Sequence, residues 1–346
     1  MLVSIVGTST SFTYWAFGVA WHALEEVAGQ IHHVHCTSIS EMHAQWEKRS
    51  GRSVLFTTDY LEEKVSNLIL EYGAPIVVLV DPADVAIMTA AKFRPMSFLD
   101  SIRHTSLYIS SLADVLADPS TVVFGTRART ALVRDFLPRF FRAMQLPEDP
   151  TLLPRVLRRI CPEESSWDVL TVDQAIKSSQ PSVEVQGLLS EWSEREVEAF
   201  RKVAADYQQI LDRKPTIQFT WPAAILHSPT SGYTTEKPLA LIGPARPLIW
   251  GPYMHLPKGR WLASMEFEVC DNHSPNTVIA EVLVDWKTES KGEFDLPLQG
   301  IFVWNLEFEV KDVTKPIEVR LTLSKSAIEG TFFLREVRLS NLADLD

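Results

Sequence analysis

Apolar and polar positions follow different patterns in the two halves of this chain. In the first half, short continuous apolar runs alternate with segments whose apolar residues recur at helical spacing. The predicted buried strands are residues 2–6, 53–56, 76–80 and 121–124, and the amphipathic segments between them include 60–72 and 98–116. Strand, helix and strand in this order predict a parallel sheet with helices on both faces.

The second half alternates with period two. Apolar residues occupy every other position of three segments, 261–269, 302–310 and 317–323. This alternation, without an intervening helix, predicts an antiparallel β-sandwich and places Trp261, Trp286 and Trp304 in its core. We therefore expect an α/β three-layer domain over residues 1–212 and an all-β sandwich over 213–346.

Charge and composition narrow the classes of partner. The 346 residues carry a net charge of −11, which argues against a protein that grips nucleic acid or anionic lipid through a positive field. No apolar run is long enough to span a membrane. The three cysteines lie far apart and form no CxxC pair, as is usual in a reducing compartment. We expect a cytoplasmic protein.

The segment after the first predicted strand is rich in hydroxyl side chains. It comprises Gly7, Thr8, Ser9, Thr10, Ser11, Phe12 and Thr13. A strand that runs into such a turn and then a helix is the layout of a phosphate-binding site, because loop and helix N–H groups attract an anion. The Gly-Lys-Ser/Thr of a Walker loop is absent. A plain turn in which Ser11 or Thr13 caps the helix is the alternative, and binding of another anion or a sugar nucleotide is a third.

This loop resembles that of sulfotransferases, Gly-x-Pro-Lys/Arg-Ser-Gly-Thr-Thr-Trp, and agrees with it at Gly7, Ser11, Thr13 and Trp15. Residues 80–88 resemble the second sulfotransferase motif, Arg-Asp/Asn-Pro-Arg/Lys-Asp-Val-Ala-Val-Ser. The resemblance covers roughly the first 210 residues. It implies a P-loop-like α/β fold and, in the family, the donor PAPS.

The departures from those motifs concern the donor. Thr10, Val80 and Met88 stand where the family carries a Lys/Arg, an Arg and a Ser that hold PAPS. Phe12 replaces a glycine at which the backbone would approach a phosphate. The cofactor is therefore unknown, and PAPS or another nucleotide is expected only if the altered loop still binds one.

Three acidic or basic residues are further candidates in this half. Asp59 follows a predicted strand near the place of the sulfotransferase base, so it is either a general base or the cap of a helix starting near Tyr60. Arg127 and Arg129 follow another strand, where α/β sheets bind ligands. They either supply the missing anion contacts or pair with neighbouring acids.

Two other groups draw attention. His33 and His35 would share one face of a strand while His32 and Cys36 share the other, so we predict no metal site. Residues 250–261 resemble the entry segment of β-sandwich modules that accompany bacterial glycan enzymes. Trp250 and Tyr253 in this predicted turn are candidates for stacking on sugar rings; otherwise they plug one end of the sandwich.

The leading hypothesis is a bacterial protein of surface-polysaccharide biosynthesis. Its altered sulfotransferase-like domain would bind or modify a glycan or a nucleotide-linked precursor without PAPS, among possible protein partners of a polysaccharide assembly. One alternative is an active PAPS-dependent glycan sulfotransferase, with Asp59 as base and Arg127 or Arg129 in place of the lost contacts. Another is a non-enzymatic scaffold.

Overall fold

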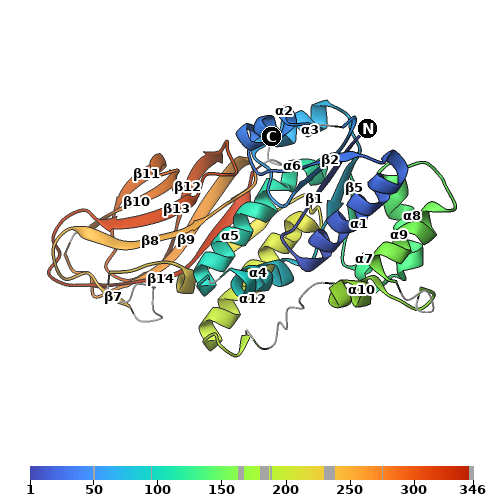
Figure 1. The fold of residues 1–346 in the computed structure, drawn as a ribbon. Coiled ribbons are helices and arrows are strands. Elements are labelled where there is room, and N and C mark those ends of the chain that lie inside the picture. The colour runs from blue at the N-terminus through green and yellow to red at the C-terminus, as the bar shows by residue number, and fades with distance from the viewer. Residues whose placement is uncertain are drawn as a thin grey trace. The chain divides into compact units, whose positions relative to one another are not determined.

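A computed structural model describes residues 1–342 except 50, 95, 163–166, 180–186, 188, 230–237 and 275. The chain divides into two compact units (Figure 1). The first, which we call the α/β unit, comprises Met1–Phe93 and Ser111–Val185. The second, the β unit, comprises Arg94–Ser110 and Gln186–Asp346. This division differs from the expected single boundary after residue 212, because two helices of the first half group with the later strands.

The α/β unit contains a five-stranded parallel sheet in the order β2-β3-β1-β4-β5. The strands are β1 (Leu2–Gly7), β2 (Ile31–His35), β3 (Ser53–Thr58), β4 (Ile76–Leu79) and β5 (Val122–Phe124). The helices are α1 (Ser11–Ala28), α2 (Ile39–Glu47), α3 (Glu63–Glu71), α4 (Ala83–Phe93), α6 (Ala113–Ala117), α7 (Arg127–Thr130), α8 (Val133–Ala143), α9 (Leu152–Ile160) and α10 (Val172–Ser179). The predicted α/β parallel sheet is confirmed.

Strand β1 lies in the centre of this sheet. It pairs with β3 on one side and with β4 on the other. The chain leaves β1 toward the β2 edge and leaves β4 toward the β5 edge. In such sheets the connections diverge and open a crevice at the carboxyl ends of the strands, where ligands bind. The loop after Gly7 and the segment after Leu79 meet at this place.

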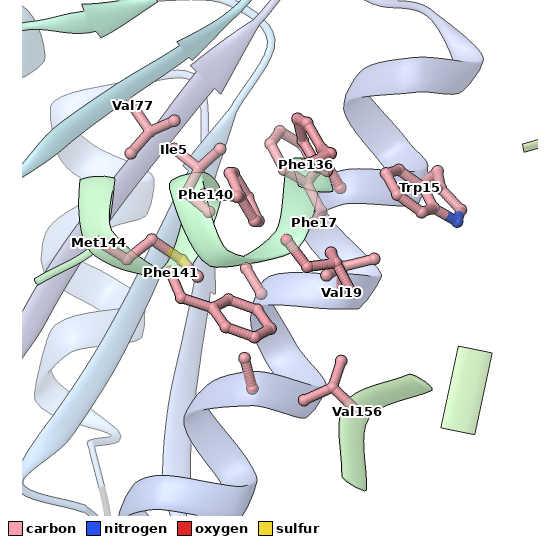
Figure 2. Packing of buried hydrophobic residues seen from close by; sticks show 14 of the residues in the cluster. Ile5, Trp15, Phe17, Val19, Val77, Phe136, Phe140, Phe141, Met144 and Val156 are labelled. Carbon is pink, nitrogen blue, oxygen red and sulfur yellow. The ribbon is translucent and has the colours of Figure 1, made fainter. Parts of the chain in front are cut away.

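The core of the α/β unit lies on the α1 face of the sheet. Val3 and Ile5 of β1 belong to it, as strand alternation requires, together with residues of α1, α8, α9 and α10. Aromatic rings of α8 fill the space between helix and sheet: the ring centroids of Phe136 and Phe140 are 5.3 Å apart (Figure 2). The continuous apolar runs of β1 and β4 are buried on both faces of the sheet. Polar residues therefore do not alternate with apolar ones in these strands, and Ser4 is the exception.

The β unit contains two antiparallel sheets, in the orders β11-β10-β13-β8 and β12-β9-β14-β6. Its strands are β6 (Gln218–Pro222), β7 (Leu239–Ala240), β8 (Arg246–Met254), β9 (Gly259–Cys270), β10 (Thr277–Val284), β11 (Lys287–Asp295), β12 (Gly300–Val310), β13 (Ile317–Leu323) and β14 (Thr331–Asn341); a short 3-10 turn, η2, spans Ala223–Ile225. The expected period-two strands are confirmed.

Among the residues that the structure describes, two long helices belong to the β unit, α5 (Phe98–Ser111) and α12 (Glu194–Leu211). They hold the backbone of His255, which follows β8. The N–H of His255 donates to Ser106 Oγ (3.1 Å), and its carbonyl accepts from Ser110 Oγ (3.0 Å) and from the Tyr207 hydroxyl (2.6 Å). These buried bonds explain why the helices group with the strands.

The three tryptophans expected in the sandwich core differ in their burial. Trp261 is fully buried, which confirms its prediction. Trp286 is 64% exposed, so the prediction that it lies in the sandwich core is wrong. It lies in the turn between β10 and β11 and not on a strand. Trp304 is half-buried against Phe294, with ring centroids 4.0 Å apart.

No helix in the described part of the chain has the length and apolar character needed to cross a membrane.

Candidate functional site

The end of β1 admits only glycine. A Cβ atom on Gly7 would lie 2.5 Å from the backbone oxygen of Leu79 and 2.6 Å from Thr13 Oγ1. Real Cβ atoms do not approach a backbone carbonyl so closely, so any side chain would push β4 and α1 away from the strand. The first turn of α1 is thereby held against the carboxyl ends of β1 and β4.

Hydroxyl groups surround this close contact. The Thr8 side chain accepts a hydrogen bond from the Asp81 N–H (3.1 Å) and so joins the loops after β1 and β4. The hydroxyls of Thr10 and Thr13 are fully buried and have no hydrogen-bond partner. A buried hydroxyl without a partner is costly, so these two groups leave unsatisfied hydrogen-bonding capacity at the start of α1.

The start of α1 corrects the capping prediction. Its N-cap is Thr10, not Ser11 or Thr13, and no side chain caps the helix. The first N–H groups of an uncapped helix present partial positive charge. Phe12 does not fill the loop, because its ring is buried in the core 6.1 Å from the ring of Phe136.

Asp59 joins this loop through a residue that the sequence reasoning missed. The Tyr14 hydroxyl donates to Asp59 Oδ2 (2.6 Å) and lies 2.9 Å from Ser9 Oγ. Asp59 is only 3% exposed. It does not cap the next helix, since α3 begins at Glu63 with Glu62 as its N-cap, so the capping prediction is wrong. The one feature that could have pointed to the contact of Tyr14 with Asp59 is its place on the exposed face of α1.

Arg129 is held by two carboxylates. Its NH1 contacts Asp81 Oδ2 at 2.9 Å and its NH2 contacts Asp173 Oδ1 at 2.6 Å. Burial lowers the pKa of Arg129, but the charges and hydrogen bonds of these two acids outweigh it and raise the pKa overall. The second oxygen of Asp81, Oδ1, is buried without a partner. Arg129 is therefore neutralised by acids that are distant in sequence, Asp81 and Asp173, and not by neighbouring acids.

Arg127 lies exposed at the start of α7. Three arginines that follow it in the chain, Arg134, Arg155 and Arg159, pair with acids. Arg134 contacts Asp168 at 2.6 Å, and Arg159 contacts Glu26 at 2.8 Å. The carboxyl ends of β1, β3 and β4 thus bring together hydroxyls and carboxylates, and the guanidinium of Arg129 is already paired with Asp81 and Asp173. Such a lining suits a neutral, hydroxyl-rich ligand better than a polyanion.

Two of the three histidines of β2, His33 and His35, share a partner, whereas His32 Nε2 lies 3.0 Å from the Gln45 carbonyl oxygen. His33 Nε2 and His35 Nδ1 lie 2.7 Å and 2.9 Å from Thr57 Oγ1, so they occupy one face as predicted. Burial, followed by the charges of His35 and His32, lowers the pKa of His33. Across the described ranges, no group of three or more metal-ligating side chains gathers.

An aromatic cluster lies on the β unit. Trp250 and Tyr253 are in β8, not in a turn as predicted, and each is half-buried. The imidazole of His227 stacks on Trp250, with ring centroids 6.0 Å apart. The exposed Trp286 ring lies 5.1 Å from the Tyr253 ring. We call Trp250, Tyr253 and Trp286 the aromatic platform.

Two charged residues, Arg103 and Glu318, act on Tyr253 of this platform. The Arg103 guanidinium lies 5.1 Å from the centroid of the Tyr253 ring and donates to His227 Nε2 (2.7 Å). Glu318 is 2% exposed; its Oε1 accepts from Arg320, while its Oε2 has no partner. Burial and then the charge of Glu318 raise the pKa of Tyr253, which keeps its hydroxyl protonated.

No protein-family model matches the chain, and no curated protein does. Among solved structures, a mouse sulfotransferase complexed with PAP is similar at 10% identity and a TM-score of 0.39, over 58% of this chain and 82% of that one. An α-L-arabinofuranosidase with bound arabinose is similar at 9% identity and a TM-score of 0.22, over 29% and 18%. The VP2 subviral particle of infectious bursal disease virus is similar at 11% identity and a TM-score of 0.25, over 37% of this chain and 33% of that one.

Proposed function

We propose that this protein binds a glycan or its nucleotide-linked precursor in bacterial surface-polysaccharide biosynthesis, and that it does so without PAPS. The observation that carries the proposal is the exposed indole of Trp286 beside the ring of Tyr253. The bacterial and polysaccharide parts rest on the resemblance of residues 250–261 to sandwich modules that accompany glycan enzymes.

The backbone at Trp286 supports a binding role. Asp285 and Trp286 have φ of 51° and 67°, a pair of positive values found in tight hairpin turns whose second position usually holds glycine. A bulky residue in this conformation is strained, and such strain concentrates at functional sites. The turn presents a flat apolar ring to solvent, which is the surface on which sugar rings stack.

The α/β unit supports the exclusion of PAPS. The guanidinium of Arg129, the expected substitute for the lost basic residues, is bound by Asp81 and Asp173. A polyanionic donor would have to displace these carboxylates and would then face them as like charges. The unpartnered hydroxyls of Thr10 and Thr13 fit instead the hydroxyls of a sugar.

Binding of glycans tests this proposal. The full chain is screened on a glycan array, and the best glycan is titrated by calorimetry against wild type and Trp286→Ala. Loss of one stacking ring is expected to weaken binding by roughly tenfold or more. Phe93→Ala is the matched control, since Phe93 is also an exposed aromatic residue (48%) but lies on α4. Absence of any glycan signal, or equal loss in the control, would overturn the proposal and favour a scaffold.

A PAPS-dependent sulfotransferase is retained as the second candidate because Asp59 is buried beside the loop and reaches it through Tyr14. Titration with 3′-phosphoadenosine 5′-phosphate separates the two. Micromolar binding that Arg129→Met abolishes would replace the first proposal by the second.

A further inference from the structure

A cavity lies on the face of the parallel sheet away from α1. It has a volume of about 160 Å³ and lies among α2, α3, β1 and β3. Three aromatic side chains line it, Trp46, Phe56 and Tyr72, together with Met42 and Leu68. Trp46 and Tyr72 are exposed, by 38% and 72%, so the cavity opens to solvent at its rim.

One polar group lies on the floor of this cavity. Ser4 is the only hydroxyl-bearing residue in β1, it is fully buried, and its Oγ has no hydrogen-bond partner. Its neighbours across the sheet are Phe56 and Ile76, both apolar. Val3 and Ile5 point into the α1 core, so alternation directs Ser4 to the opposite face, where it lines the cavity.

The chemistry of the walls defines the ligand class. The lining residues include no Asp, Glu, Lys or Arg, and their one histidine, His43, is exposed at the rim. A charged ligand in the buried part of the cavity would therefore be desolvated without a counter-charge. An apolar cavity of about 150 Å³ accommodates a benzene ring. The Arg49 guanidinium lies 4.5 Å from the centroid of the Trp46 ring and holds the outer wall in place.

We propose that this cavity binds a small neutral aromatic molecule that carries one hydrogen-bonding substituent, of the phenol or indole class. The ring lies among Trp46, Phe56 and Tyr72, and its substituent pairs with Ser4 Oγ. The inference is independent of the proposed function, because it involves neither the aromatic platform nor the loop after β1.

Phenol and toluene test the proposal on the full chain. They share the same ring, but phenol carries a hydroxyl group where toluene carries a methyl group. Binding is followed by shifts of the backbone amide resonances of β1, α2 and α3. One hydrogen bond predicts roughly three- to tenfold tighter binding of phenol than of toluene. Ser4→Ala is expected to abolish this preference while toluene still binds.

Two further variants keep the test decisive. Ser66→Ala is the matched control: Ser66 lies on α3 and is also buried without a partner, but it does not line the cavity, so the preference for phenol is expected to persist. Leu68→Trp fills the cavity from its rim and is expected to weaken both probes. Equal affinity of wild type for the two probes, a preference that survives Ser4→Ala, or binding unaffected by Leu68→Trp would overturn the inference, as would the absence of shifts at millimolar probe.

Discussion

The pKa values of a half-buried carboxyl, Asp206, and a buried imidazole, His255, are shifted in opposite directions in the β unit. Burial raises the pKa of Asp206 from 3.8 to about 6, although the Thr220 N–H and Lys202 oppose this rise. Burial lowers the pKa of His255 from 6.5 to about 4, although its hydrogen bond to the Val313 carbonyl opposes this fall. We predict that replacing Asp206 by asparagine makes the free energy of unfolding of the β unit depend more steeply on pH, because the contribution of His255 is then no longer opposed.

The sign of each contribution follows from which state binds the proton more tightly. Folded Asp206 binds its proton more tightly than the unfolded chain, so it favours folding below pH 3.8 and loses that contribution as pH rises through about 6. Folded His255 binds its proton less tightly, so its contribution is present above pH 6.5 and is lost as pH falls through about 4. Between these values the two slopes oppose each other.

The magnitudes decide the net slope. The change at His255 corresponds to roughly 3 kcal/mol of unfolding free energy. Asp206 is only partly buried, so solvent screening reduces its contribution to about 1–2 kcal/mol. The wild-type β unit should therefore gain about 1–2 kcal/mol as pH rises from about 4 to 6.5, and the Asp206→Asn unit roughly 3 kcal/mol.

Urea denaturation at a series of pH values measures this difference. Fluorine NMR of fluorotryptophan at Trp261, which is fully buried, reports unfolding of the β unit alone. Asp212→Asn is the control, because Asp212 is an exposed aspartate at the end of the same helix. Parallel pH profiles for wild type and Asp206→Asn would refute the reasoning.

Three further changes test the packing. Gly7→Ala places a Cβ against the Leu79 carbonyl and should lower the melting temperature of the α/β unit by several degrees in calorimetry. Arg129→Leu leaves the Asp81 carboxylate buried without its ion pair and should cost about 3–5 kcal/mol in urea denaturation, whereas Arg129→Lys should recover part of it. Tyr207→Phe removes a buried hydrogen bond and should destabilise the β unit by about 1–3 kcal/mol; an unchanged midpoint would contradict that role.

Seven strands were predictable because the burial of each shows in a short stretch of sequence: residues 2–6, 53–56, 76–80, 121–124, 261–269, 302–310 and 317–323. The same rule failed at Trp286. Residues 282, 284 and 286 alternate as an inward-facing set would, but β10 ends at Val284 and a two-residue turn reverses the chain. Alternation carries no information about where a strand stops, so Trp286, the exposed member of the aromatic platform, was assigned to the core.

Local sequence patterns could not identify contacts between residues that lie far apart in the chain. The helical period of residues 98–116 predicted a helix there, but period alone does not say which sheet a helix covers. Ser106 contacts a backbone N–H 149 positions later in the chain. The pairing of Arg129 with Asp81 likewise joins groups 48 residues apart, which composition and spacing cannot identify.

The assignment of α5 to the β unit has a consequence for synthesis on the ribosome. At about 5–20 residues per second, the 149 positions that separate Ser106 from His255 take roughly 7–30 seconds to translate. During that interval α5 has been made, but the strand end that satisfies its serines has not. Until His255 is made, Ser106 and Ser110 lack their native contacts to its backbone, and slower codons after residue 111 would lengthen that interval.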